Sequence, residues 1–437
     1  MTFGEAQTFL LEKARELGVE IEILARETRE LSLEAFGGKL EQITQATRGG
    51  VGLRAVTGGK TGYAYSEERS EEALLWALHE AKENAELQTS EGGFLPQGSA
   101  LGRKDLLSEG LSAPLAEKAQ AALELESQVR QDKRIKQVSF ASYSERETTT
   151  TLASSAGASG SYRDGSASLG TSVLMQEGKN VKEGWKAASE KDFHSLEPGK
   201  TALEAIQKTG RLLGARALGT GRHTAYLEPD AVASLLDLLL YMLSGKSVME
   251  GRSRLAEKLE QKIASELITL RDDPLKPDGR ASRPFDSEGT PSQTLTLIEG
   301  GVLRSFMHNS ATGQATGQAN TGHAQRSYRG VLEVGPSNLV LEPGSGITYA
   351  EGVIVTDLMG LHAGANPITG DFSLQALGLK VEGGEVVYPV EDFAVSGNLL
   401  ELLERVVGVG DVPEWAGWGG AVSTPMLEVT DLSFAGA

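Results

Sequence analysis

The sequence predicts an α+β protein, with an N-terminal α+β domain of helices packed on antiparallel sheets and a C-terminal β-rich domain with a few helices. Alternating apolar and polar residues follow a short amphipathic helix, and glycine pairs separate the alternating runs. Helical spacing becomes rare after Asp286. A chain of 437 residues is longer than one hydrophobic core normally accommodates. We therefore expect two domains, 1–220 with possible subdomains 1–100 and 101–220, and 221–437.

The N-terminal domain is expected to repeat the order helix, meander, helix. The first unit begins with a helix over 1–18, and acidic residues after Ser70 begin its second helix, over 71–88. The strand over 19–35 is followed by three alternating runs, separated by the glycine pairs 37–38, 49–50 and 58–59. The second unit is expected as a helix over 113–131, strands around 135–147, 148–154, 160–164 and 167–177, and a helix over 198–217. A true duplication and two ordinary α+β halves both remain open.

The C-terminal domain is expected to begin with two helices and to continue as strands. The first helix starts at Glu228-Pro229-Asp230, since proline suits a first helical turn and the carboxylates complement the helix dipole. It should run over 229–244, with a second helix over 252–267. Glu299-Gly300-Gly301 predicts a hairpin turn between strands over 294–298 and 302–306.

Composition limits the classes of partner and compartment. The formal charge of −18 disfavours phosphate backbones, so no nucleic-acid partner is expected. The chain has no cysteine, which suits a reducing compartment such as the cytoplasm. The longest apolar run is far shorter than a membrane span, and the first residues contain charges inside an amphipathic pattern, so neither a membrane nor a signal peptide is expected.

Local sequence motifs do not predict a metal site or an activated nucleophile. None of the six histidines has a partner at the i,i+3 or i,i+4 spacing that places two ligands on one helix face. A site assembled from His308, His323 and His362 with Asp371 or Asp392 remains possible on sequence grounds. No Gly-x-Ser-x-Gly occurs, and the glycine-rich runs lack the flanking strand, helix and lysine of a phosphate loop.

Two segments carry candidate peptide-binding residues. After the predicted hairpin, the chain is rich in amides and glycines over 308–326 and is expected to be a long flexible loop, either for recognition or at a mobile interface. Over 357–398, polar residues alternate with glycines that let a backbone approach closely. The candidates are His308, Asn309, Gln314, Gln318, Asn320, His323, Arg326, His362, Asn366, Thr369, Asp371 and Ser373.

Long motifs resemble the TldD/PmbA family over essentially the whole chain. They include GRSRL at 251–255, DDP at 272–274, DSEGTPSQTLTLIEGGVL at 286–303 and LMGLHAGANPITGDFSLQALG at 358–378. They are most similar to the PmbA branch, also called TldE. The resemblance implies a metallopeptidase complex that degrades unfolded peptides or matures them, in which a TldD-like chain supplies zinc. The family has also been labelled a modulator of DNA gyrase.

The same resemblance implies where the zinc-binding helix of the family would lie, in the helix expected over 229–244. Zinc-binding members carry His-Glu-x-x-x-His there, whereas this chain has Tyr241, Met242 and Lys246 in the corresponding stretch. A lysine ammonium would repel a zinc ion. We therefore expect no catalytic residue, no metal and no cofactor in this chain, with zinc in a TldD-like partner.

The leading hypothesis is a non-catalytic peptide-binding subunit that pairs with a TldD-like zinc subunit in a heterodimer or larger assembly, or with itself. One alternative is a hydrolase in its own right that uses the loop histidines and carboxylates. The other is a structural homodimer without a substrate. Activity of the isolated chain and measured peptide affinity distinguish these three hypotheses.

Overall fold

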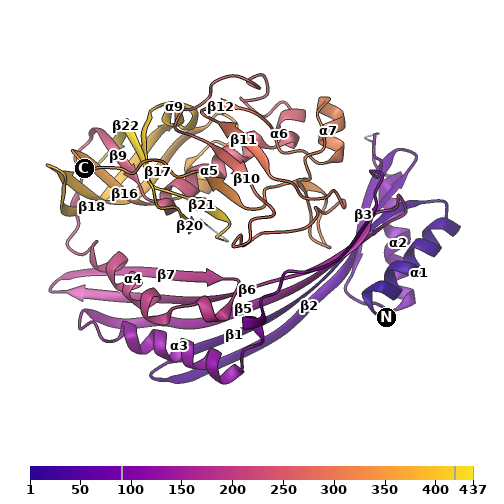
Figure 1. Ribbon diagram of the computed structural model, residues 1–437, viewed down its shortest axis with the longest axis horizontal. Helices are drawn as coiled ribbons and strands as arrows, with labels where there is room; N and C mark the ends of the chain where they lie inside the picture. The colour runs from indigo at the N-terminus through magenta and orange to yellow at the C-terminus, as the bar shows by residue number, and fades with distance from the viewer. Residues whose placement is uncertain (90–91, 418–419, 437) are drawn as a thin grey trace.

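The computed structural model describes residues 1–89, 92–417 and 420–436. A long, strongly curved N-terminal sheet lies beneath a compact C-terminal part, with helices along the outer side of the sheet (Figure 1). The α+β class and the β-rich C-terminal region are confirmed. No helix in the described ranges is long and apolar enough to cross a membrane.

The N-terminal sheet is seven-stranded, in the order β3-β2-β1-β5-β6-β4, with β7 also pairing with β6. All of its neighbouring strands are antiparallel except β4 and β6. The strands are β1 (Glu20–Phe36), β2 (Lys39–Thr57), β3 (Lys60–Ser66), β4 (Ala100–Asp105), β5 (Ile135–Ser154), β6 (Ser159–Glu177) and β7 (Asn180–Glu190).

Helices cover the sheet at its two ends. The helices α1 (Phe3–Glu16) and α2 (Glu71–Glu86) pack on one end, and α3 (Leu115–Val129) and α4 (Pro198–Gly210) pack on the other. Thr2 and Glu5 form a capping box at α1, and Ser70 caps α2 as its position predicts. The predicted helix over 198–217 is too long, because Arg216 and Ala217 form strand β8 beside β18.

Three predicted strand boundaries in this sheet are wrong. The glycine pair at 49–50 is not a turn but lies inside β2. The strands expected over 135–147 and 148–154 form the single strand β5, and those expected over 160–164 and 167–177 form the single strand β6. A glycine inside a strand often marks a close approach by another backbone. That is the case at Gly52, because a Cβ built there would lie 2.1 Å from the carbonyl oxygen of Tyr328.

The C-terminal part contains a closed ring of strands and a second sheet. Because β22 pairs with both β9 and β18, the strands β22, β9, β16, β17 and β18 form the ring, with β19 and β8 alongside. Their bounds are β8 (Arg216–Ala217), β9 (Gly221–Leu227), β16 (Gly352–Met359), β17 (Asp371–Glu382), β18 (Glu385–Asn398), β19 (Val406–Val409) and β22 (Leu427–Ala435).

The second sheet has the order β12-β11-β10-β15-β21-β20, so β20 lies at an edge. Its strands are β10 (Leu270–Asp272), β11 (Leu295–Glu299), β12 (Val302–Leu303), β15 (Leu339–Leu341), β20 (Glu414–Ala416) and β21 (Val422–Thr424), and β13 (Ala324–Gln325) pairs separately with β14 (Glu333–Val334). The predicted hairpin is confirmed in β11 and β12, where Ile298 pairs with Leu303. Gly300 and Gly301 in its turn have φ of 53° and 78°.

The helix α5 (Pro229–Leu243) contacts strands of both C-terminal sheets and carries much of the core between them. It begins at Pro229, as the Glu228-Pro229-Asp230 motif predicts. The helix predicted over 252–267 is wrong, because that segment is a series of turns. The remaining helices are short: α6 (Gly245–Met249), α7 (Ser310–Thr316), α8 (Leu361–Gly364) and α9 (Leu399–Glu404).

Gly52→Ala is predicted to destabilise the protein by about 1–3 kcal/mol, because the new methyl group would overlap the backbone of Tyr328. Urea unfolding followed by circular dichroism measures the change. Gly199→Ala in the first turn of α4, where a Cβ meets nothing within 4 Å, is the control and should leave stability unchanged or raise it by up to about 1 kcal/mol. Equal stability of the two variants would contradict the close approach.

Candidate functional site

Strand β1 carries two different faces. Ile21, Ile23 and Ala25 belong to the apolar cluster under α1 and α2. Because successive side chains point to opposite faces, Glu22 and Arg26 lie on the other face, toward the C-terminal part. The alternation of apolar and polar residues along β1 thus places the charged side chains of Glu22 and Arg26 against the second half of the chain.

A buried ion network joins the two halves at this face, formed by Glu22, Arg54, Glu288 and Arg326. Arg54 donates to Glu288 at 2.7 Å and to Glu22 at 3.0 Å, and Arg326 donates to the other oxygen of Glu22 at 3.1 Å. The four side chains are at most 4% exposed. Burial lowers the pKa of Arg54, but the carboxylates of Glu22 and Glu288 outweigh it and raise the pKa above its ordinary value.

The network continues into the candidate segment over 308–326. Glu288 accepts hydrogen bonds from the backbone N–H of Ser310 at 2.9 Å and from its hydroxyl at 2.5 Å. Asn309 caps α7 through the N–H of Thr312. The segment is therefore anchored at the start of α7, and the prediction of a long flexible loop there is wrong.

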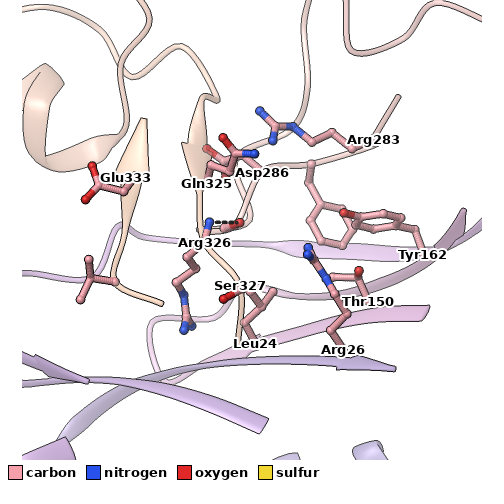
Figure 2. A pocket seen from close by; sticks show the side chains of 13 residues that line it. Leu24, Arg26, Thr150, Tyr162, Arg283, Asp286, Gln325, Arg326, Ser327 and Glu333 are labelled. Atoms are coloured by element: carbon pink, nitrogen blue, oxygen red, sulfur yellow. Dashed lines mark hydrogen bonds between the residues drawn. The ribbon is translucent and has the colours of Figure 1, made fainter. Parts of the chain in front are cut away.

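Beside the network lies a cavity of about 400 Å³, here called the arginine pocket. Figure 2 shows Arg26 and Thr150 on the N-terminal strands facing Arg283 and Asp286 of the C-terminal part. The pocket is lined by Leu24, Arg26, Thr150, Tyr162, Arg283, Phe285, Asp286, Ser287, Gln325, Arg326, Ser327, Val331 and Glu333.

Asp286 is the buried carboxyl group of this pocket. Its oxygens accept hydrogen bonds from the backbone N–H groups of Glu288, Thr290 and Ala324 at 2.8–3.0 Å. Burial, with the neighbouring Glu288 carboxylate, raises the pKa of Asp286 to about 6. Its ionisation is thus opposed by its surroundings, although the three donors keep it in place.

Residues 241–246, which by resemblance correspond to the zinc-binding stretch of the family, contact both candidate segments, 308–326 and 357–398. Met242 is fully buried, and its methyl group is 3.0 Å from the position of a Cβ on Gly370. Gly245 donates to the carbonyl of Met307 at 2.7 Å, and Lys246 pairs with Glu333 at 2.6 Å. Tyr241 is half-buried at the end of α5. These side chains pack or form an ion pair within the fold.

Within the segment over 308–326, the structure buries His308, Asn309, His323 and Arg326 and leaves Gln314 and Gln318 exposed, with Asn320 half-buried. Asn320 donates to the hydroxyl of Thr290 at 3.0 Å. Burial, with His323 nearby, lowers the pKa of His308 to about 4, so its ring is neutral near pH 7. The exposed amides alone are accessible to a peptide in this arrangement.

A chain of hydrogen bonds here has the residue types of a nucleophile, base and orienting acid. His323 lies 3.1 Å from Asp272 through Nε2 and 2.9 Å from the hydroxyl of Thr321 through Nδ1. Thr321 Oγ1 also accepts from the N–H of His308, and all three side chains are buried. A substrate has no access to this hydroxyl, so the arrangement stabilises the segment.

The candidate residues over 362–373 belong to α8, to the turn after it and to the start of β17. His362, on α8, is exposed, as are Asn366, Asp371 and Ser373, while Thr369 is half-buried. Asn366 accepts hydrogen bonds from the backbone N–H groups of residues 368 and 369, which form a compact turn. Asn398 and Arg254 donate to the carbonyl of Thr369.

The predicted distant cluster of histidines and carboxylates is only partly assembled. His308 and His323 are neighbours, and His362 lies on α8. Over residues 1–89, 92–417 and 420–436, no group of three or more His, Cys, Asp or Glu side chains is placed to hold a metal ion.

A second hollow, here called the α4–β20 cleft, separates α4 and β7 from the edge strand β20. Its volume is about 910 Å³. Val412, Pro413 and Trp415 give it an apolar wall, and the Val412 side chain is exposed. Arg280 stacks over the ring of Trp415 at 5.5 Å. The opposite wall carries charges of both signs, including Lys200 and others on α4.

Sequence reasoning missed the arginine pocket and the ion network. A signal was present in β1 and β2, where Glu22 and Arg54 occur among residues that are otherwise apolar and buried. A charged residue in a buried strand is normally paired. The glycines at 50 and 52 were a second signal, because both give space to Tyr328 from the C-terminal part.

Sequence models of one family match most of the chain. The PmbA/TldA metallopeptidase domain 1 matches residues 21–85, the central domain matches 109–213, and the C-terminal domain matches 220–436. A protein of Haemophilus influenzae named metalloprotease PmbA homolog is 26% identical over 424 residues, which cover 93% of this chain and 91% of that protein. Metalloprotease PmbA of Escherichia coli O157:H7 is 24% identical, with 93% and 92% covered.

Solved structures share the fold over almost the full length. A Thermotoga maritima protein named as a candidate modulator of DNA gyrase has a TM-score of 0.88 and 27% identity, and the match covers 99% of this chain and 100% of that chain. TldE from Thermococcus kodakarensis has a TM-score of 0.86 and 22% identity, with 98% and 100% covered. At 22% identity the second likeness shows the fold alone.

Arg54→Met is predicted to destabilise the protein by about 3–5 kcal/mol, because it leaves the carboxylates of Glu22 and Glu288 buried without their main partner. Chemical denaturation measures the loss. The control is Arg48→Met on the same strand, where the side chain is exposed and a change within about 0.5 kcal/mol is expected. Similar losses in both variants would show that the network is not a main source of stability.

Asp286 predicts a specific pH dependence. A folded-state pKa of about 6, against an ordinary 3.8, means that its contribution to stability is fully present below pH 3.8 and is lost as pH rises through 6. From pH 4 to pH 7 the natural protein should therefore lose about 2 kcal/mol relative to Asp286→Asn, which has no proton to release. Urea titrations of both proteins across this range test the trend, and a constant difference would refute it.

Proposed function

Since the chain belongs to the PmbA/TldD metallopeptidase family, we propose that it is a non-catalytic, peptide-binding subunit that acts with a zinc-bearing member of the same family. It would hold peptides for proteolysis or maturation by that partner. The observation that carries this proposal is the α4–β20 cleft, which borders an edge strand. We propose that the protein acts in the cytoplasm, because a chain without cysteine suits a reducing compartment.

The cleft has the properties that extended peptides need. Strand β20 pairs with β21 on one side only among the described strands, so its other edge is available for main-chain hydrogen bonds. The apolar wall of Val412, Pro413 and Trp415 suits side chains exposed by unfolded peptides. Its volume of about 910 Å³ accommodates several residues of an extended chain.

The end of α5 and the start of α6 support a non-catalytic role. Met242 is committed to packing and Lys246 to an ion pair with Glu333, so this stretch offers no pair of metal ligands. A partner would supply zinc, which would activate the attacking water and polarise the scissile carbonyl. The residues of this chain would bind and orient the peptide.

DNA gyrase appears in the name of the similar Thermotoga maritima protein. For this chain, any such effect would pass through the peptides it binds, because a net charge of −18 opposes contact with DNA. The partner can be a separate zinc-bearing chain. Self-association would give an assembly without the catalytic metal, so peptide cleavage is expected only in the mixed complex.

The purified chain alone should contain no stoichiometric zinc and should leave a casein-derived peptide uncut. Mixing it with a purified family member that carries His-Glu-x-x-x-His should give a complex whose zinc resides in that member. Metal analysis and cleavage assays on each chain and on the mixture make the comparison. Cleavage by the isolated chain that a chelator stops would overturn the proposal.

Val412→Asp is expected to weaken binding of a fluorescent unfolded peptide about fivefold or more, because it places a charge in the apolar wall of the cleft. Fluorescence anisotropy gives the dissociation constants. The matched control is Val407→Asp, which changes another exposed valine outside the cleft. If both variants bind as the natural protein does, the cleft is not the peptide site.

A further inference from the structure

The arginine pocket contains more positive charge than its own carboxylates balance. Three arginines, Arg26, Arg283 and Arg326, line it together with Asp286 and Glu333. The carboxylate of Glu333 is already paired with Lys246 at 2.6 Å. Asp286 is held by backbone N–H groups and has no ion pair with a described residue, although the charge of Arg283 acts on it. Arg326 keeps one bond to Glu22, whereas Arg26 and Arg283 form no ion pair with a described residue, so guanidinium donors remain for an external anion.

Arg326 provides the most direct sign of a missing partner. Its side chain is 0% exposed, and a single nitrogen, Nη2, reaches a carboxylate, that of Glu22. Among the described residues, its Nη1 and Nε have no hydrogen-bond partner. Burial lowers the pKa of Arg326, and the attraction of Glu22 does not offset it. Buried polar groups are nearly always hydrogen-bonded, so these two donors call for an acceptor.

Other polar atoms of the pocket are also without partners. Thr150 is 2% exposed, and its buried hydroxyl has no hydrogen bond in the described part of the chain. Arg26 forms no ion pair with any described residue, and its Nε is buried and unpaired. Figure 2 shows its guanidinium group directed between Tyr162 and Ser327. Donors from both halves of the chain thus converge on one space.

The remaining wall of the pocket is apolar. Leu24, Tyr162 and Phe285 pack together along it, with the two rings edge to face at 5.1 Å. An inorganic ion would leave this wall unused, whereas an organic carboxylate would place its carbon skeleton there. The planar guanidinium fork matches the two oxygens of a carboxylate.

We propose that the arginine pocket binds the carboxylate group of a small organic acid or of a short peptide's C-terminus, held by Arg26 and Arg326 with its carbon chain against Phe285. The pocket shares no lining residue with the α4–β20 cleft, so this site is independent of the proposed peptide site. A volume of about 400 Å³ limits the ligand to a group of roughly dipeptide size.

The test uses the full chain and isothermal titration with four probes: N-acetyl-Ala-Ala, its C-terminal amide, glutarate and inorganic phosphate. The N-acetyl dipeptide should bind, and the amide should bind at least tenfold more weakly. Tighter binding of glutarate than of the dipeptide would assign the pocket to free acids, and the reverse would assign it to peptide ends. No binding of either acid, equal binding of acid and amide, or phosphate binding as tight as either acid overturns the proposal.

Arg26→Gln should weaken binding of the acid at least tenfold. Arg26 lies outside the ion network, so the variant is expected to fold, which circular dichroism checks. The matched control is Arg48→Gln, which removes an equal charge from an exposed position and should leave the affinity unchanged. Unchanged affinity in Arg26→Gln would refute the assignment. Acid binding that survives Val412→Asp, together with loss of long-peptide binding, would separate the two sites.

Discussion

The buried charges of Glu22, Arg54, Glu288 and Arg326 determine how the two halves of this molecule meet. A charged group removed from water is tolerated only with a partner at short distance, so the halves can approach in one register that satisfies all four side chains. That register places the cationic side of the arginine pocket and anchors α7 through Glu288. The cavity, the anchored segment and the fit of Tyr328 over β2 all depend on the same contact.

The residues that most resemble a catalytic triad are buried and hydrogen-bonded to one another in this chain. The buried row of Asp272, His323 and Thr321 resembles a triad in composition, yet the surrounding fold encloses it. Met242 at the end of α5 packs in the core, and Lys246 in α6 forms an ion pair. Open space lies elsewhere, in the arginine pocket and the α4–β20 cleft. These two hollows, unlike the buried row, are therefore open to a ligand.

Local sequence signals predicted what local interactions determine. Three features depend on neighbouring residues and were predicted: the hairpin at Gly300-Gly301, the start of α5 and strand β1. The ion network was not, because Arg54 and Glu288 are 234 residues apart and no local pattern links them. The glycines inside β2 were misread for the same reason. A glycine pair normally indicates a turn, and here the distant Tyr328 fills the space beside two of the glycines inside the strand. Sequence reasoning also mistook the anchored segment over 308–326 for a flexible loop, since its anchors are distant in sequence.

The division of charges within the ion network affects how the protein is made. Glu22 and Arg54 belong to adjacent strands and already form a pair at 3.0 Å, so the first half of the chain brings one acid and one base to the join. Glu288 and Arg326 bring another acid and base when the ribosome delivers the second half. Within this network of four, each half contributes no net charge, and N-terminal parts generally fold first during synthesis. The first sheet can therefore keep Glu22 and Arg54 paired in water before the second half covers them.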